Sequence, residues 1–155
     1  MVSRIQISVA ALVRDGLVLL AHRQPLRHAY PDRWDLVGGH VEEGELPHQA
    51  VGRECLEELG VHIHDPLPIP MTVHDPALEV HAFLVTRWDG EPVNAAPEEH
   101  DDLRWFGPSD LAGVELAHSE MLSSIVGAIR LATARSAGSA LAEGDPWGDD
   151  TGARG

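Results

Sequence analysis

The stretch from Pro47 to Gly60 restricts the fold more than any other part of the chain, because it predicts a helix with two unlike faces. Proline is favoured at the first position of a helix and glycine just after the last, so these two residues mark its ends. Residues three and four apart share a face. One face is therefore apolar and carries Val51, Cys55 and Leu59. Another carries the carboxylates of Glu54, Glu57 and Glu58.

The carboxylate face has two readings, a solvated acidic surface or a cation site, and spacing alone favours neither. Like charges at these spacings cost about 0.2–0.5 kcal/mol per pair, and Arg53 is the nearby basic partner. Oxygen donors gathered this closely suit Mg²⁺ or Mn²⁺. The helix also has Leu46 where a capping side chain is usual, and Gly52 in its interior. A helix shaped by stability alone would have neither.

The segments around this helix predict one domain with strands and helices mixed. Residues 5–13 alternate with a period of two and 17–23 follow a turn, so we expect a hairpin. Further strands are expected at residues 34–37, 61–65, 71–75 and 78–88. After them we expect an acidic loop over 94–103, a helix over 119–135 and a mobile tail over 136–155. This order fits an α+β domain, or a three-layer arrangement of helices around a mixed sheet.

Composition narrows the partners and the compartment. The formal net charge is -14, and all 11 basic residues are arginine, so the sequence shows no basic patch for nucleic acid. The single cysteine, Cys55, fits a reducing cytoplasm. We read neither a signal peptide nor a membrane span, and therefore expect a cytoplasmic protein without a membrane partner. The 10 histidines suggest no zinc site, since His62 and His64 lack a third ligand at suitable spacing.

Residues 39–61 resemble the Nudix hydrolase signature, G-x5-E-x7-R-E-U-x-E-E-x-G-U, where U is a bulky aliphatic residue. The chain has Gly39, then Glu45, then the run RECLEELGV from Arg53 to Val61, so every charged and glycine position of the signature is filled. Cys55 stands at an aliphatic position, where a small apolar side chain can still pack inside. A chance match at so many positions is very improbable.

The resemblance implies an α/β fold, an α/β/α sandwich with a mixed sheet between helices, over residues 1–135. It also implies hydrolysis of the pyrophosphate bond in a nucleoside diphosphate linked to another group, with Mg²⁺ or Mn²⁺ as cofactor. By position, four residues would hold the metal: Gly39, Glu54, Glu57 and Glu58. Arg53 would orient these carboxylates through charge-assisted hydrogen bonds. The expected partner is a small nucleotide-like substrate, and the chain a monomer or homodimer.

The base that accepts the proton of the attacking water is less defined. Glu57 or Glu58 could serve, although a carboxylate that faces a cation is a poor base. Some relatives recruit a glutamate from a distant loop, and the acidic loop offers Glu98 and Glu99, of which we take Glu98 as the candidate. The same loop also reads as solvated acidic surface.

Phosphate-binding groups are expected near the strand that leads into the signature. Arginine forks bind phosphate through two hydrogen bonds, and Arg23 and Arg33 flank this strand, so we take them with Gly38 as substrate-binding candidates. Each arginine alone also reads as an exposed loop charge.

Several substrates and one different activity stay open. The compact domain favours nucleoside triphosphates, whereas ADP-ribose or a nucleotide sugar is the alternative. The isomerases of isopentenyl diphosphate that share this fold need an active-site cysteine, but Cys55 falls on the apolar face of the helix. A catalytically silent nucleotide-binding module would not need to keep Arg53 and the glutamates.

Overall fold

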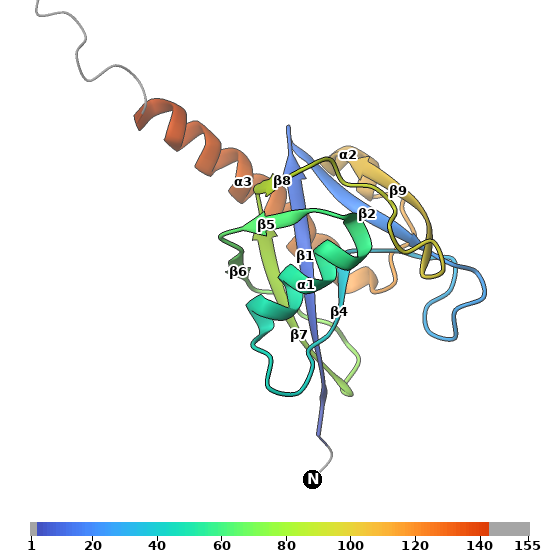
Figure 1. Ribbon diagram of the computed structural model, residues 1–155. Coiled ribbons are helices and arrows are strands. Elements are labelled where there is room, and N and C mark those ends of the chain that lie inside the picture. The colour runs from blue at the N-terminus through green and yellow to red at the C-terminus, as the bar shows by residue number, and fades with distance from the viewer. Residues whose placement is uncertain (1–2, 143–155) are drawn as a thin grey trace, which may run out of the picture.

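The computed structural model describes residues 3–142 and is built around the amino-terminal hairpin (Figure 1). β1 (Ile5–Arg14) and β2 (Leu17–Arg23) pair antiparallel, with Val13 opposite Val18. The expected hairpin is thereby confirmed. β1 also pairs parallel with β7 (Leu78–Val85) and antiparallel with β4 (Val37–His40). The sheet is therefore mixed, and β1 lies at its centre.

The remaining strands complete the main sheet and form a second one. β3 (Trp34–Asp35) and β9 (His100–Phe106) pair with β2, while β6 (Leu67–Ile69) pairs with β7. Together these seven strands form the main sheet. β5 (His62–His64) and β8 (Arg87–Asp89) form a separate two-stranded sheet.

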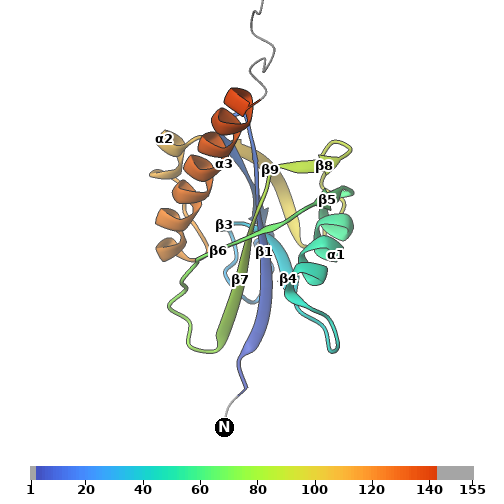
Figure 2. The same cartoon turned by 90° about the vertical axis from the view of Figure 1, so that its left-hand side faces the viewer.

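Helices cover both faces of the main sheet (Figure 2). α1 (Pro47–Leu59) lies on one face, and α2 (Pro108–Leu111) and α3 (Leu122–Ala142) lie on the other, with a short 3-10 helix (Ser119–Met121) before α3. The buried residues form two clusters, one per face. Val9, Ala11 and Val13 belong to the cluster under α3, whereas Ala10 and Leu12 belong to the cluster under α1. The expected α/β/α sandwich is confirmed.

From Ser8 to Val13 both faces of β1 are buried, which explains why residues 9–13 are apolar at odd and at even positions. The apolar face predicted for the helix is also correct. Val51, Cys55 and Leu59 of α1 are fully buried against the sheet. Burial raises the pKa of the Cys55 thiol to about 12, so this side chain is a core residue.

Some expected boundaries differ from the structure. The strand expected at 34–37 is divided at Leu36 between β3 and β4. Residues 71–75 do not form the expected strand; β6 lies earlier, at 67–69, where Pro68 is tolerated because β6 is the edge strand of the sheet. β9 begins at His100, inside the expected acidic loop. α3 continues past residue 135 to Ala142 because its small residues include many alanines, the best helix former. The rest of the expected tail, residues 143–155, lies outside the described residues.

Among the helices of residues 3–142, none is both long and apolar enough to cross a bilayer.

Candidate active site

α1 begins at Pro47 with a cap that the sequence does not show. The Leu46 backbone N–H donates to the Gln49 side-chain oxygen at 2.9 Å, and the Gln49 N–H donates back to the Leu46 carbonyl at 3.0 Å. Gln49 thus replaces the missing capping side chain. Ser8 of β1 donates its hydroxyl to the Pro47 carbonyl at 2.8 Å, which ties the first turn to the sheet. At the other end Gly60 adopts the left-handed conformation (φ 70°) that ends the helix.

The two glycines of β4 make room for two different neighbours. β4 pairs with β1, with Gly38 opposite Val9 and Gly39 opposite Ser8. A Cβ on Gly38 would collide with the backbone carbonyl of Ser8. A Cβ on Gly39 would lie 2.5 Å from the Glu54 carboxylate. Gly39 therefore lets a carboxylate of α1 lie directly against the strand.

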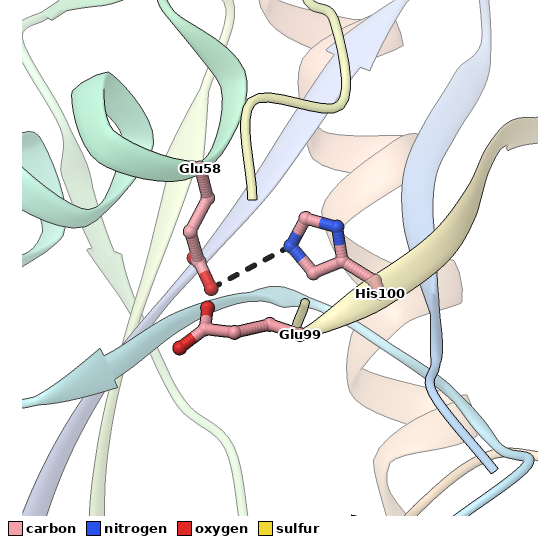
Figure 3. Close-up of side chains that lie close together, drawn as sticks. All are labelled: Glu58, Glu99 and His100. Carbon is pink, nitrogen blue, oxygen red and sulfur yellow. Dashed lines mark ion pairs between the residues drawn. The ribbon is translucent and has the colours of Figure 1, made fainter. Parts of the chain in front are cut away.

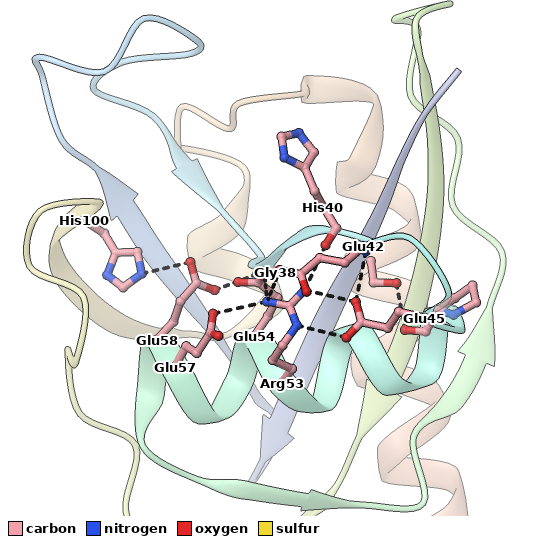
Figure 4. Close-up of polar contacts among 11 residues, drawn as sticks. Gly38, His40, Glu42, Glu45, Arg53, Glu54, Glu57, Glu58 and His100 are labelled. Carbon is pink, nitrogen blue, oxygen red and sulfur yellow. Dashed lines mark hydrogen bonds and ion pairs between the residues drawn. The ribbon is translucent and has the colours of Figure 1, made fainter. Parts of the chain in front are cut away.

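Arg53 is the centre of a carboxylate network (Figure 4). Its guanidinium binds Glu45 through two hydrogen bonds, from Nε at 2.9 Å and from Nη2 at 3.1 Å. Nη1 donates to Glu54 at 2.9 Å and to Glu57 at 3.2 Å, and Nη2 also donates to the His40 carbonyl at 3.0 Å. One arginine thus fixes the end of the loop, the strand β4 and two carboxylates of α1.

The carboxylates of this network have different environments. The hydrogen bond from Arg53 lowers the pKa of Glu45, whereas burial raises the pKa of Glu54 despite the same arginine. The Glu57 side chain is 58% exposed. Glu54 and Glu57 share one face of α1, and Arg53 holds both.

Glu58 is the most perturbed carboxyl of the site. It is buried, its Oε2 accepts the Gly38 N–H at 3.1 Å, and Arg53 forms no hydrogen bond with it within residues 3–142. Burial first, and then a hydrogen bond with Glu99 and the charges of Glu54 and Glu99, raise the pKa of Glu58 to about 10. A second carboxylate next to Glu58 is therefore part of the site.

Glu99 and His100 reach Glu58 from the segment that leads into β9 (Figure 3). The backbone N–H groups of Val93 and Ala95 donate to the last carbonyls of α1, those of Leu59 and Glu58, at 3.0 and 2.9 Å. These bonds satisfy helix-end carbonyls and hold the segment against α1. One ligating atom each from Glu58, Glu99 and His100 lies within 4.8 Å of the other two.

His100 is 4% exposed and its two ring nitrogens differ. Nδ1 lies 2.9 Å from the Asn94 side-chain oxygen, and Nε2 lies 3.6 Å from Glu58 Oε1. Within residues 3–142 no atom makes a hydrogen bond with Nε2. Burial lowers the pKa of His100, so the imidazole is favoured in its neutral form.

The structure brings together the signature residues but not all the expected ones. Glu98 is exposed, and the turn in which the Glu99 N–H donates to the Ala96 carbonyl at 2.9 Å instead places Glu99 beside Glu58. The structure therefore places Glu99, and not the expected Glu98, next to Glu58.

The two arginines are engaged within the chain. Arg23 donates to the carbonyls of Ala29 and Tyr30 and lies 3.5 Å from Asp35, so it holds the loop after β2. Arg33 pairs with Glu115. The structure thus gives both a role within the fold, and the expectation that they bind substrate has no support from their contacts.

The sequence does not reveal the roles of His100 and Asn94, because a β-bulge directs His100 toward α1. β9 pairs Asp102 with His22 and His100 with Arg23, which leaves Asp101 unpaired. In a regular strand Asp101 would share the face of Leu103 and Trp105, which pack under α1. Instead Asp101 binds His22 and His100 faces Glu58. The sequence signals a strand in HDDLRWF, but not this bulge.

The α/β/α sandwich and the carboxylate network around Arg53 are both typical of a Nudix hydrolase, and comparison with known proteins agrees. The profile of the NUDIX domain family matches residues 4–125. The NAD-capped RNA hydrolase NudC of Stutzerimonas stutzeri is 36% identical over 75% of this chain and 41% of its own length. The CTP pyrophosphohydrolase of Escherichia coli is 30% identical over 76% of this chain and 86% of its own.

A solved structure gives the same result. The crystal structure of the MutT NUDIX hydrolase from Burkholderia pseudomallei superposes with a TM-score of 0.65, at 32% identity, over 70% of this chain and 86% of that one. The chain therefore belongs to the Nudix hydrolase family, a family of pyrophosphohydrolases, and the resemblance of residues 39–61 is confirmed. It spans less than half the length of the NudC relative.

Proposed function

We propose that this protein is a metal-dependent pyrophosphohydrolase of nucleoside triphosphates. The observation that carries the proposal is the carboxylate cluster of α1, in which Arg53 holds Glu54 and Glu57 while Glu58 stays buried beside Glu99. A solvated acidic face would leave all three carboxylates in water. Here Glu54 and Glu58 are withdrawn from solvent, with 13% and 6% of their side chains exposed.

The residues present fit a divalent cation. Burial and like charge raise the pKa of Glu58 to about 10, so its ionised form needs a positive partner that the described residues do not supply. We propose that Glu54, Glu58 and Glu99 hold Mg²⁺ or Mn²⁺, with Gly39 leaving the space in which Glu54 lies. A divalent cation supplies positive charge against the phosphate oxygens and makes water a stronger acid.

Glu57 is the carboxylate that we assign as general base. Its side chain is 58% exposed, and its contact with Arg53 is, at 3.2 Å, the longest hydrogen bond that the guanidinium makes in the described chain. It is therefore open to water and near the other carboxylates. Arg53 then positions both the base and Glu54.

The substrate class rests on the relatives and on charge. The E. coli CTP pyrophosphohydrolase matches this chain over most of both lengths, whereas the NudC relative extends far beyond the matched part. A chain of net charge -14 also needs a cation to accept a triphosphate, because its own field repels polyanions. Both observations support a small nucleotide as substrate.

The test is phosphate or pyrophosphate release from nucleoside triphosphates, nucleotide sugars and dinucleotides, with Mg²⁺ or Mn²⁺. We expect triphosphates to react fastest, and Glu57→Gln and Glu58→Gln each to lower kcat about 100-fold or more. Glu43→Gln is the matched control, because Glu43 is an exposed glutamate of the loop before α1. Absence of wild-type activity with both ions would favour a silent binding module. Full activity of both variants would show that the carboxylates were assigned wrongly.

A further inference from the structure

We propose that His100 Nε2 is a nitrogen donor to the cation of this site, which therefore prefers a divalent transition-metal ion such as Mn²⁺ over Mg²⁺. This inference rests on the proposed function, because it adds a ligand to the cation site inferred there. It stands on the tautomer of His100, its burial and its distance from Glu58.

Asn94 fixes which nitrogen of His100 carries the proton. The Asn94 amide nitrogen donates to the His100 carbonyl at 2.7 Å, and the amide oxygen accepts the Ala96 N–H at 3.3 Å. These two backbone partners set the orientation of the amide, so its oxygen is the atom that faces His100 Nδ1 at 2.9 Å. An oxygen acceptor requires a proton on Nδ1. Nε2 of the neutral ring then carries a lone pair that can bind a cation.

That lone pair is buried and points into the carboxylate cluster (Figure 3). His100 is 4% exposed, and among residues 3–142 nothing hydrogen-bonds its Nε2. Buried polar atoms in folded proteins nearly always have a partner, so an orphan atom of this kind calls for one. A nitrogen lone pair flanked by Glu58 and Glu99 faces the place where a cation would lie.

The distances suit a shared ion better than a direct hydrogen bond. Ligand-to-ion distances of about 2.1 Å place two donors of one ion about 3.0–4.2 Å apart. Nε2 and Glu58 Oε1 are separated by 3.6 Å, and the three groups lie within 4.8 Å of one another. A hydrogen bond between nitrogen and oxygen would be about 2.7–3.2 Å long.

The surrounding backbone holds this arrangement without help from an ion. Val93 and Ala95, on both sides of Asn94, donate to the carbonyls of Leu59 and Glu58 at the end of α1. The bulge at Asp101 directs His100 toward the same helix. Asn94 is therefore a positioning residue, since it acts through His100 and fixes the tautomer, as hydrogen-bond partners of ligating histidines do.

A nitrogen donor changes the ion that the site prefers. Imidazole suits transition metals, whereas Mg²⁺ is bound almost wholly by oxygen atoms. Glu58 and Glu99 alone would make an oxygen site. With His100 the donor set is mixed, which favours Mn²⁺ over Mg²⁺.

The test measures the ligand directly on the full chain. Metal-free protein receives less than one equivalent of Mn²⁺ without substrate, and electron spin echo envelope modulation records nitrogen nuclei coupled to the ion. Wild type labelled with ¹⁵N-histidine gives the same measurement without any substitution. His100→Gln assigns the signal, and His64→Gln, in β5 and bound to Asp89, is the matched control. The dissociation constants of Mn²⁺ and Mg²⁺ are measured alongside.

We expect nitrogen modulation in wild type that changes on ¹⁵N labelling, remains in His64→Gln and disappears in His100→Gln. The Mn²⁺ dissociation constant of His100→Gln should rise about tenfold or more, with a smaller change for Mg²⁺. Mn²⁺ bound without nitrogen modulation, or with modulation that survives His100→Gln, would overturn the inference and leave the proposed function standing. If wild type binds no Mn²⁺ or Mg²⁺, the proposed function fails as well.

Discussion

At the scale of single residues, Glu58 has no arginine partner among residues 3–142, whereas three other glutamates of the site share Arg53. Arg53 binds Glu45, Glu54 and Glu57, and each of these bonds is charge-assisted. Glu58 instead has a backbone N–H and a second carboxylate as neighbours. The free energy of unfolding of the metal-free protein should therefore depend on the protonation of Glu58 more than on that of any glutamate bound to Arg53.

Glu58 predicts a pH dependence of stability that one substitution removes. Its folded-state pKa of about 10 exceeds the usual glutamate value of about 4.3, so the folded metal-free protein binds one more proton than the unfolded chain. Its contribution to stability is complete below about pH 4 and is lost as pH rises toward 10, at up to about 1.4 kcal/mol per pH unit. Glu58→Gln should flatten this decline.

Urea unfolding in EDTA from pH 6 to pH 9 provides the measurement. Wild type and the exposed control Glu43→Gln should lose stability in parallel across this range. A Glu58→Gln curve parallel to that of wild type would show that Glu58 is ionised in the folded metal-free protein.

At the scale of elements, the unit of β4 and α1 positions the site, and its two glycines predict separable effects. Alanine at Gly38 meets the Ser8 carbonyl of β1, which is backbone and cannot move away cheaply. We expect Gly38→Ala to lower the free energy of unfolding by about 1–3 kcal/mol or more. Alanine at Gly39 meets the Glu54 carboxylate, the far end of a flexible side chain. Gly39→Ala should therefore cost little stability but weaken Mn²⁺ binding.

Urea unfolding and Mn²⁺ titration of both variants separate the two effects. The metal dissociation constant should rise about tenfold in Gly39→Ala, since changing the surroundings that orient a metal ligand, here Glu54, costs about that much. If Gly39→Ala proves as destabilising as Gly38→Ala while its metal affinity is normal, Gly39 serves the sheet and not Glu54.

The same elements show what the sequence predicts and where it stops. The helix 47–59, its apolar face and its carboxylate face follow from residue spacing, because helical geometry converts spacing directly into faces. The partners of that face do not follow. Glu99 and His100 lie far along the chain, and the bulge at Asp101 and the backbone bonds of Val93 and Ala95 place them. Local patterns carry no information on such long-range contacts, and for the same reason they do not reveal that Arg23 contacts the loop after β2 and that Arg33 pairs with Glu115.

At the scale of the whole molecule, the mixed sheet separates two buried clusters with different tasks. The cluster under α1 supports the helix that carries the carboxylates, whereas the cluster under α3 lies on the opposite face (Figure 2). The central strand β1 contributes buried side chains to both clusters, Val9, Ala11 and Val13 to one and Ala10 and Leu12 to the other. Stability is therefore shared by the whole domain, but the geometry of the site depends on one face.

This division predicts that two equally buried residues affect function unequally. Leu59 of α1 and Ile125 of α3 are both fully buried, and truncating either to alanine should cost about 2–5 kcal/mol. Leu59 adjoins Glu58 in the chain, so collapse around the cavity of Leu59→Ala shifts the carboxylate that we place in the cation site. Ile125→Ala relaxes α3, which lies across the sheet from α1 (Figure 2).

Urea unfolding gives the stabilities, and Mn²⁺ titration is performed at a temperature where circular dichroism shows both variants folded. We expect the Mn²⁺ dissociation constant to rise several-fold in Leu59→Ala and to stay within twofold of wild type in Ile125→Ala. Equal weakening in both variants would mean that the two faces of the sheet are coupled. The cation site would then depend on the packing of the entire sandwich, and the separation of tasks inferred from the two clusters would be wrong.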